Sequence, residues 1–300
     1  MVASIKEMKW AITGGSGQLA RSITDLLKSQ GINHHAWSHR ELDISNPEEI
    51  KKILKFQPTV IVNCAAWTNV DGAESHFDEA LVINRDGAKN VALTAKELDI
   101  PLIHISTDYV FSGNANQPWK TTHETHPTTK YGESKLQGEI AIRNEWSERS
   151  SILRTAWLYG PYGKNFAKTI LKRAISASDQ IRVVNDQMGQ PTTSKDLAKQ
   201  ILDFVTLGAP NGLYHATNSG QATWWDFAKE IVSLVDESMA RVVPVSSREF
   251  SSRVSRPAFS VLDHSDWSKV GLRPMRDWRE ALREVFPSIQ SEVEKELSND

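Results

Sequence analysis

The sequence predicts an α/β protein: a Rossmann-type, doubly wound parallel sheet with a smaller, partly discontinuous α/β domain for a substrate. Three observations support this fold class. Short apolar segments typical of strands alternate with amphipathic helical segments up to Gly160. A glycine-rich turn separates the first strand segment from the first helix. Beyond Gly160 the alternation loosens, and the last third is richer in Trp, Arg and Pro.

The order of the elements follows from the spacing of apolar residues. Apolar side chains three and four residues apart indicate helices, and short continuous apolar runs indicate strands buried on both faces. The first half is predicted to contain strands at 9–13, 32–38, 59–66, 101–111 and 151–160, and helices at 17–29, from Pro47 onward, at 79–98 and around Tyr131. The carboxyl ends of parallel strands share one edge of the sheet, and ligands bind there.

The second half is predicted to complete the sheet and to form the smaller domain. Its elements are a helix at 165–177, a strand at 181–184, a helix at 195–206 capped by Thr193 or Ser194, a strand at 212–217 that joins the main sheet, and a helix after Asp277. We therefore expect residues 1–160, with about 192–222, to form the Rossmann domain. Residues 161–191 and 223–300 are expected to form the substrate-binding domain.

Composition and charge exclude several classes of protein. The 300 residues include 35 basic and 37 acidic ones, so the chain lacks the basic surface typical of nucleic-acid binders. No apolar run reaches the roughly 20 residues of a membrane span, and the first residues have no signal-peptide pattern. The single cysteine, Cys64, excludes an intrachain disulfide. We expect a cytoplasmic protein without nucleic-acid or membrane partners.

The turn after the first strand has the pattern of a phosphate-binding loop. In the segment TGGSGQLA, Gly14, Gly17 and Ala20 occupy the three positions of G-x-x-G-x-x-[GA]. Gly14 permits a turn with positive φ, Gly17 lets a pyrophosphate reach the backbone, and Ala20 lets the helix lie close to the sheet. The helix N-terminus adds free N–H groups and a positive dipole. The loop therefore predicts a dinucleotide cofactor held at Gly14 and Gly17.

The end of the second strand indicates which dinucleotide binds. An acidic residue at this point usually recognises the ribose 2′-OH of NAD. Here Ser38, His39 and Arg40 come first, and the nearest acid is Glu41. Because Ser38 and Arg40 can hold a 2′-phosphate, we expect NADPH to be preferred and leave NADH open as the alternative.

Tyr131 and Lys135 are the candidate groups for proton transfer. Residues four apart in a helix share one face, with Cβ atoms about 5–6 Å apart. A phenol has a reference pKa of about 10, and a neighbouring ammonium stabilises its ionised form. We therefore expect Lys135 to lower the pKa of Tyr131, while also donating to a nicotinamide ribose. The Ser106-Thr107-Asp108 segment ends the fourth strand, at the same edge of the sheet.

The loop, the Ser-Thr-Asp segment and the Tyr-Lys pair together resemble the extended short-chain dehydrogenase/reductase superfamily. A finer resemblance, to the dTDP-4-dehydrorhamnose reductase family, extends to about residue 285. It is carried, in this order, by GGSGQLA, ELDISN, NCAAWTNVDGAE, STDYVFSG, YGESKLQGE, RTAWLYGPYGKNF, VVNDQMGQPT and RPAFSVLD. This resemblance implies NADPH-dependent reduction of the C4 ketone of dTDP-4-dehydro-L-rhamnose to dTDP-L-rhamnose.

The resemblance also implies roles for individual residues. The catalytic residues would be Thr107, Tyr131 as the proton donor, and Lys135. Cofactor contacts are implied for Gly17, Gln18, Leu19, Asp43, Ile44, Ala65, Ala66 and Thr68, besides Tyr131 and Lys135. Substrate contacts are implied for Thr107, Asp108, Tyr131 and Trp157. Arg256 and Lys164 are further candidates, because a cation must meet the substrate diphosphate.

The same features leave other functions open. A non-catalytic regulatory subunit that binds NADP would carry the same loop, and a reductase of another nucleotide 4-keto sugar would use the same residues. A dehydratase is disfavoured because Tyr109, and not an acid, follows Asp108. An epimerase-reductase would use a cysteine, whereas Cys64 is expected inside the third strand. The partner is a small nucleotide sugar, and the sequence is compatible with a homodimer or a monomer.

Two groups of histidines are poor candidates for a metal site. Strand alternation directs His34 and His35 to opposite faces, so they cannot share an ion with His39. His123 and His126 lie in a polar segment without a third ligand. Some relatives bind magnesium through glutamates at a dimer interface, but these glutamates cannot be placed here. We predict no metal.

Overall fold

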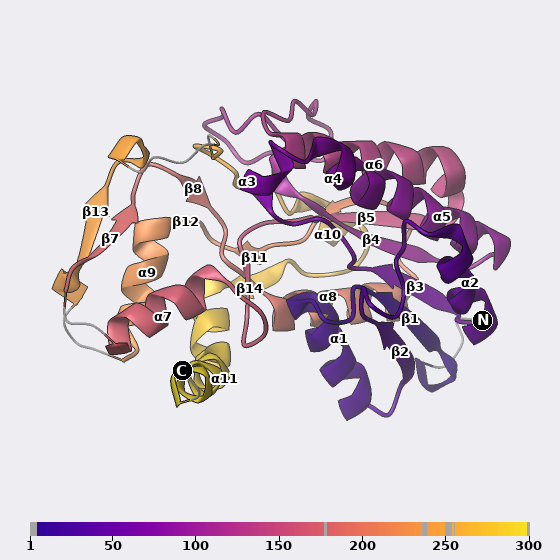
Figure 1. Cartoon of the computed structure of the whole chain (residues 1–300), viewed down its shortest axis with the longest axis horizontal. Helices are drawn as coiled ribbons and strands as arrows, with labels where there is room; N and C mark the ends of the chain where they lie inside the picture. The colour runs from indigo at the N-terminus through magenta and orange to yellow at the C-terminus, as the bar shows by residue number, and fades with distance from the viewer. Residues whose placement is uncertain (1–4, 177–178, 236–238, 250–253, 255, 299–300) are drawn as a thin grey trace.

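A six-stranded parallel sheet forms the larger part of the molecule. The computed structural model describes residues 5–176, 179–235, 239–249, 254 and 256–298. The strands lie in the order β10-β5-β4-β3-β1-β2 (Figure 1). Their bounds are β1 Lys9–Thr13, β2 Asn33–Trp37, β3 Val60–Asn63, β4 Leu102–Thr107, β5 Ser150–Thr155 and β10 Gly212–His215. All neighbouring strands in the sheet are parallel. The predicted Rossmann-type, doubly wound fold is confirmed.

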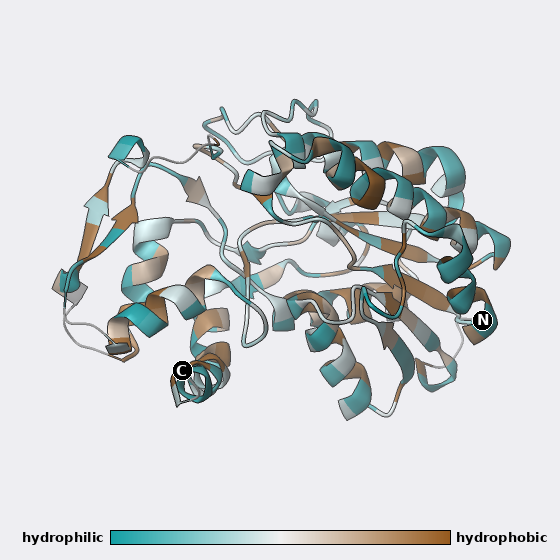
Figure 2. Ribbon diagram, in the orientation of Figure 1, coloured by the Kyte–Doolittle hydropathy of each residue, from teal (hydrophilic) through white to brown (hydrophobic). Residues whose placement is uncertain are grey.

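Helices cover both faces of this sheet, as Figure 1 shows. The helices on one face are α1 Gln18–Ser29 and α8 Ser194–Leu207; those on the other are α2 Pro47–Phe56, α5 Ala88–Glu97 and α6 Lys130–Trp146. Successive strand residues alternate between the two cores, with Trp10 and Ile12 packed towards α1 and Ala11 towards α2. The sheet consequently packs against an apolar core on each side, and brown segments lie among its central strands in Figure 2.

Local side chains set the beginnings of the helices. Asn46 caps α2 by accepting a hydrogen bond from the Glu48 N–H at 3.0 Å, as predicted. Thr193 caps α8 by accepting from the Asp196 N–H, also at 3.0 Å, which decides between the two predicted caps. Within the described residues, no helix has both the length and the apolar character needed to cross a membrane.

The predicted long helix at 79–98 is interrupted. It consists of α4 Phe77–Leu81, a π-helical stretch Val82–Gly87, and α5; the short α3 Val70–Ala73 precedes it. The widened turn directs Asn84 inward, where its side chain accepts from the Trp67 N–H at 2.9 Å and donates to the Ser134 hydroxyl at 2.8 Å. These bonds connect the loop after β3 to α6.

Three predicted strands are too long at their carboxyl ends. β3 ends at Asn63, so Cys64 lies beyond the strand, and β4 ends at Thr107 in a 3₁₀ turn, Asp108–Val110. β5 ends at Thr155, and the chain then turns through Trp157, whose φ is +47°. Apolar residues continue past each end because they pack in the loops, which must leave the sheet to form its ligand-binding edge.

The rest of the chain forms a second packed region beside this edge. Its core includes Phe227, Trp278 and Phe286, on helices α9 Trp224–Ser233 and α11 Trp278–Ser298. The other elements of the second half are α7 Phe166–Ser176, α10 Ser265–Lys269, β6 Leu158–Tyr159, β7 Ile181–Val184, β8 Met188–Gly189, β9 Thr192–Thr193, β11 Asn218–Ser219, β12 Ala222–Thr223, β13 Val242–Val245 and β14 Met275–Asp277. The predicted domain boundaries stay a prediction.

A buried ion pair joins α6 to the middle of the sheet. The Arg154 guanidinium on β5 binds the Glu139 carboxylate of α6 with two hydrogen bonds, at 2.9 and 2.7 Å. The Ser106 hydroxyl on β4 donates to the same carboxylate at 2.6 Å. The side chains of Arg154 and Glu139 are 3% and 2% exposed. Each charge is therefore acceptable in this core only because the other is present.

We expect Arg154→Met to destabilise the protein by about 3–5 kcal/mol, because it leaves the Glu139 carboxylate charged and unpaired in the core. Urea unfolding measures the change. Arg149→Met is the matched control: Arg149 pairs with Asp99 at the surface and should cost less than about 1 kcal/mol. Adding Glu139→Leu to Arg154→Met should restore most of the stability. A fully stable Arg154→Met protein would contradict this account.

Candidate active site

The glycine-rich loop lies at the point where the strand order reverses, between β1 and β3. Gly14 has a φ of +68°, as predicted, and a Cβ there would lie 2.7 Å from the Ala65 nitrogen. Any side chain at position 14 would thus push apart the loops that follow β1 and β3. Gly17 is the N-cap residue of α1 and offers no side-chain cap, so N–H groups of the first helical turn are available to an anion. This cradle fits the pyrophosphate of a dinucleotide.

The other predicted cofactor contacts follow this edge. Leu19 is buried in the core, so only its backbone can meet a ligand. The Gln18 amide donates to the Leu158 carbonyl at 3.2 Å, which leaves its buried carbonyl oxygen without a partner. Ala65 and Ala66 are half-buried and Thr68 is exposed on the loop after β3.

The segment after β2, where the adenine end of the cofactor is predicted, carries an unexpected carboxylate. The Ser38 N–H and hydroxyl both donate to Glu41, at 2.8 and 2.7 Å. These bonds lower the pKa of Glu41. Arg40 is exposed nearby. The Asp43 carboxylate accepts from the Ser45 N–H at 2.9 Å, and Ile44 is buried.

Thr107, Asp108 and Tyr131 meet at the carboxyl end of β4. The Thr107 hydroxyl donates to the Asp108 carboxylate at 3.0 Å, and it lies close enough to the Tyr131 hydroxyl to lower the pKa of that phenol. The Tyr109 ring meets the Tyr131 ring edge-on, with centroids 5.5 Å apart. A Cβ on Gly132 would overlap the Tyr109 carbonyl oxygen. Glycine beside the tyrosine therefore lets α6 approach the turn that carries Thr107.

Burial moves the pKa values of Tyr131 and Lys135 in opposite directions. Burial raises the pKa of Tyr131 above its ordinary value of 10, although the hydrogen bond with Thr107 opposes this. Burial lowers the pKa of Lys135 to about 8, against the attraction of Glu139 and Cys64. The expectation that Lys135 lowers the pKa of Tyr131 is wrong, because the ammonium donates to the Ile105 carbonyl at 2.7 Å. Tyr131 is thus protonated at neutral pH.

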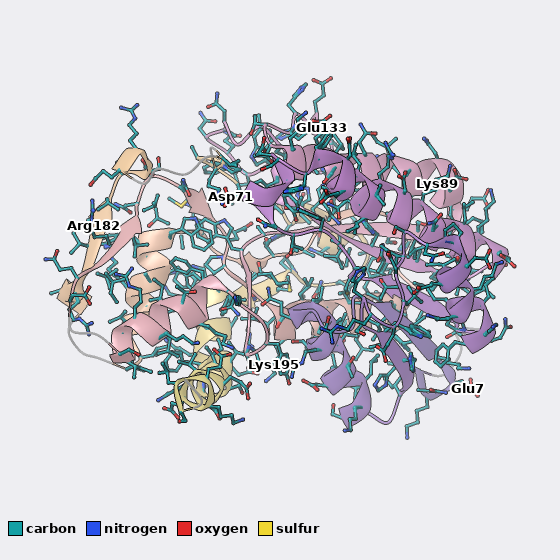
Figure 3. The ribbon with its side chains drawn as sticks, viewed as in Figure 1. Glu7, Asp71, Lys89, Glu133, Arg182 and Lys195 are labelled. Atoms are coloured by element: carbon teal, nitrogen blue, oxygen red, sulfur yellow. The ribbon has the colours of Figure 1, made fainter. Side chains whose placement is uncertain are left out.

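The predicted substrate contacts lie on both sides of the site. The Trp157 indole stacks on Trp224 of α9, with ring centroids 3.5 Å apart. Arg256 forms an ion pair with Asp71 of α3 at 2.7 Å, and its charge lowers the pKa of the neighbouring Tyr109 phenol, against the effect of burial. Asp71 lies where α3 faces the second region, as Figure 3 shows. Arg256 is therefore near the Tyr131 ring, but its guanidinium is already paired with the Asp71 carboxylate. Lys164 is exposed.

Sequence reasoning missed a set of buried polar residues behind the site, namely Thr13, Asn63, His104, Glu139 and Arg154. One signal was available: Glu139 follows Tyr131 and Lys135 at four-residue spacing and so lies on the same helix face. His104 lies within an apolar strand segment, where nothing local marks it. Its partners are 31 and 41 residues away in sequence.

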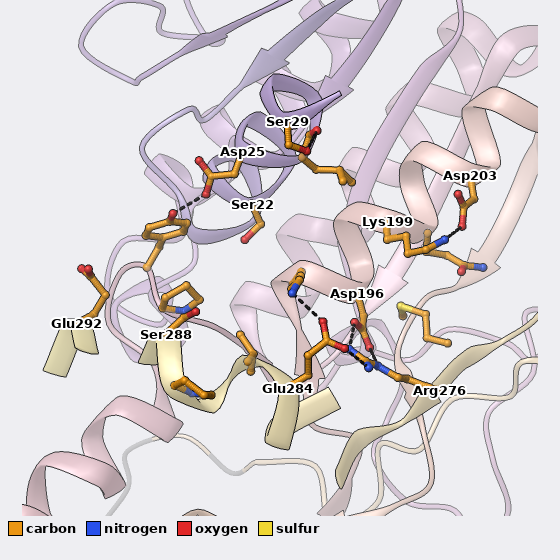
Figure 4. Close-up of a pocket in the computed structure, with 18 of the residues that line it drawn as sticks. Ser22, Asp25, Ser29, Asp196, Lys199, Asp203, Arg276, Glu284, Ser288 and Glu292 are labelled. Carbon is orange, nitrogen blue, oxygen red and sulfur yellow. Dashed lines mark hydrogen bonds and ion pairs between the residues drawn. The ribbon is translucent and has the colours of Figure 1, made fainter. Parts of the chain in front are cut away.

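A cavity of about 1300 Å³ lies elsewhere, between α1, α8 and α11 (Figure 4). Its charged groups largely pair with one another: Arg276 binds Asp196 at 2.8 Å, and Lys195 binds Glu284 at 2.7 Å. None of the predicted site residues, all of which the structure describes, lines this cavity. Across the described ranges, no group of three or more His, Cys, Asp or Glu residues is arranged to hold a metal ion.

The fold and the site define a dinucleotide-binding oxidoreductase of the short-chain type. The chain belongs to the family described as RmlD substrate binding domain, which it matches over residues 8–291. It is 41% identical over 286 residues to the dTDP-4-dehydrorhamnose reductase of Streptomyces griseus, covering 94% of each chain. The predicted family is confirmed.

Two further relatives extend this comparison. The chain is 38% identical over 285 residues to the dTDP-4-keto-6-deoxy-D-glucose reductase of Streptomyces niveus, covering 95% of this chain and 98% of that one. The crystal structure of dTDP-4-dehydrorhamnose reductase from Bacillus anthracis in complex with NADP superposes with a TM-score of 0.86 at 35% identity. That match covers 93% of this chain and 98% of the crystallised one.

The buried Asp108 carboxyl should make stability depend on pH. Burial raises its pKa to about 6, against hydrogen bonds from Ser260 and Thr107. Between about pH 4 and 6 the folded state therefore holds more protons than the unfolded state, so its stability falls as pH rises. We expect the free energy of unfolding of the wild type to fall by about 2–3 kcal/mol relative to that of Asp108→Asn as pH rises through this window. Urea unfolding at each pH measures both values. Asp99→Asn, at an exposed position, should show no such trend; parallel curves for Asp108→Asn and wild type would refute the burial effect.

Proposed function

We propose that this chain reduces the C4 ketone of dTDP-4-dehydro-L-rhamnose with NADPH to give dTDP-L-rhamnose. The observation that carries the proposal is the half-buried Tyr131, whose phenol keeps its proton and lies beside Thr107 at the ligand-binding edge of the sheet. NADPH, when bound at this edge, supplies the hydride. The named activities of the relatives and the NADP complex of the Bacillus anthracis enzyme support the same assignment.

The chain holds the cofactor through backbone groups and one buried amine. The α1 N-terminus at Gly17 and the open turn at Gly14 take the pyrophosphate. Lys135 lies on α6, and its amine donates to the nicotinamide ribose. Its pKa of about 8 keeps it largely cationic at neutral pH. Asp43 and Ile44 take the adenine, and Ala65, Ala66 and Thr68 line the middle of the cofactor.

Tyr131 protonates the C4 oxygen of the sugar as charge develops on it. Its raised pKa keeps the proton on the phenol in the resting enzyme, and an alkoxide is basic enough to take it. The Thr107 hydroxyl, which donates to the Asp108 carboxylate in the absence of substrate, rotates to donate to the same sugar oxygen. Asp108 then accepts from substrate hydroxyl groups instead.

The second region recognises the rest of the substrate. Arg256 and Lys164 meet the diphosphate, for which Arg256 exchanges its ion pair with Asp71. Trp157 contacts the sugar at the free part of its indole, since Trp224 covers one face. Another dTDP-4-keto sugar is the alternative substrate, favoured by the likeness to the Streptomyces niveus enzyme. The predicted domain boundaries, a cytoplasmic location, a homodimer and the lack of a metal are part of this proposal.

Replacing Tyr131 by Phe should lower turnover about 10²–10⁴-fold, because the general acid is lost. NADPH oxidation on addition of dTDP-4-dehydro-L-rhamnose measures turnover, and tryptophan fluorescence should show unchanged NADPH binding. Tyr109→Phe is the matched control, removing a neighbouring hydroxyl that does not touch the reacting atoms, and should cost less than about tenfold. Full turnover in Tyr131→Phe would end this assignment. No NADPH oxidation by wild type with any dTDP-4-keto sugar would favour the regulatory subunit.

Glu41 should weaken the preference for NADPH over NADH. It occupies the Ser38 donors that a 2′-phosphate would use, and its charge repels that phosphate. We expect Glu41→Gln to tighten NADPH binding about fivefold, the scale of one charge repulsion across 4 Å of water, and to leave NADH unchanged. Fluorescence titration of each cofactor measures the dissociation constants. Glu48→Gln, on the exposed side of α2, is the control; an unchanged NADPH to NADH ratio in Glu41→Gln would contradict this role.

A further inference from the structure

Four buried polar side chains form a continuous chain of contacts behind the site. The Thr13 hydroxyl donates to the Asn63 carbonyl oxygen at 2.6 Å. The Asn63 amide nitrogen lies 3.0 Å from Nδ1 of His104, and Nε2 of His104 lies 3.4 Å from Nζ of Lys135. All four side chains belong to residues at most 2% exposed. The chain thus connects the end of β1 to the amine of the Tyr-Lys pair.

The neighbouring donors orient the Asn63 amide within this chain. The Ala65 N–H lies 3.3 Å from the Asn63 carbonyl oxygen and 3.4 Å from the Thr13 hydroxyl oxygen, and a backbone N–H can only donate. The Asn63 oxygen accepts from the Thr13 hydroxyl and is the nearer acceptor for Ala65, so its amide nitrogen faces His104. Since that nitrogen is a donor, Nδ1 of His104 accepts, and the neutral ring carries its proton on Nε2.

The Nε2 proton of His104 consequently points at the Lys135 amine. Burial lowers the pKa of His104 well below 6.5, and the Lys135 charge lowers it further, so the ring stays neutral. An N–H that faces an ammonium is a donor facing a donor, whereas a neutral amine can accept it. Lys135 keeps its own donor contact with the Ile105 carbonyl at 2.7 Å. The imidazole therefore favours the neutral form of the lysine.

We propose that His104, locked by Asn63, is a positioning residue of the reductase that holds the Lys135 amine and keeps its proton labile. The other ionisable groups around the amine are Glu139 on α6 and Cys64 after β3. Glu139 is already engaged by Arg154 and Ser106. His104 is the group that couples Lys135 to the cofactor loop through Ala65. The catalytic part of this inference rests on the proposed function.

Nitrogen-15 NMR of the histidine side chains in the cofactor-free protein measures the tautomer of the His104 ring directly. We expect the His104 ring, assigned by its loss in His104→Gln, to show an acceptor Nδ1 and a protonated Nε2 from pH 6 to 9. A proton on Nδ1, or a titration within this range, would overturn the proposal. This measurement needs neither substrate nor turnover, so it stands or falls independently of the proposed reaction.

Asn63→Asp should move the His104 proton from Nε2 to Nδ1. A carboxylate at position 63 accepts from Nδ1–H, so Nε2 becomes an acceptor for the Lys135 ammonium and the pKa of the lysine rises. The fall of kcat/KM at alkaline pH should move up by about one pH unit. The thermal stability of the cofactor-free protein gives a second reading: a lysine pKa below its unfolded value makes stability rise between pH 8 and 10, and this rise should shrink in Asn63→Asp.

His104→Gln is the conservative control for the pH profile. Its amide can still present an N–H to Lys135, so the alkaline midpoint should stay within about 0.3 units of wild type. A merely structural role would lower turnover in both variants without moving the midpoint, and that outcome would refute the proposal. If Asn63→Asp does not fold, the NMR tautomer decides. If Tyr131→Phe loses its turnover but the His104 ring carries its proton on Nδ1, the proposed reaction is supported and only the role of His104 is refuted.

Discussion

Burial on both faces of the central strands is the constraint on which the rest of the structure depends. Because helices cover both sides of β3, β4 and β5, the polar side chains on these strands are buried. Those behind the site have partners inside the protein, whereas the hydroxyls of Ser150 and Thr155 on β5 have none. Glu139 has Arg154 and Ser106; Asn63 has Thr13 and His104. The polar groups of the site are thus held by a framework that tolerates little rearrangement.

The same burial supplies the chemistry. Desolvation disfavours whichever form of a group is charged, so it raises the pKa of Tyr131 and lowers that of Lys135. A phenol that keeps its proton is suited to donate it to a ketone oxygen, which is the direction of reduction. A lysine whose pKa is about 8 is largely cationic at neutral pH and loses its charge just above it. Two groups on one helix face acquire different roles from the environment alone.

The sequence predicted the helices and the site edge better than the strand ends. Helical spacing, the caps Asn46 and Thr193, and the phosphate loop are local signals, and the structure confirms them. The predicted ends of β3, β4 and β5 were wrong because apolar residues continue into loops that pack against other elements. The pKa of Tyr131 could not be read from a four-residue spacing, since it depends on burial by segments distant in sequence. Where Lys135 points is likewise set by the Ile105 carbonyl.

The contacts between the two regions explain how one mechanism can serve different substrates. Trp157 follows β5 yet stacks on Trp224 of α9, and Arg256 follows the small strands yet pairs with Asp71 of α3. These residues lie outside the buried framework of Glu139, Arg154 and His104. Substitutions among them can reshape the sugar and diphosphate contacts while Tyr131 keeps its surroundings. Relatives at 38% and 41% identity are named for different dTDP-4-keto sugars, which is the pattern this separation of substrate contacts from reactive groups would produce.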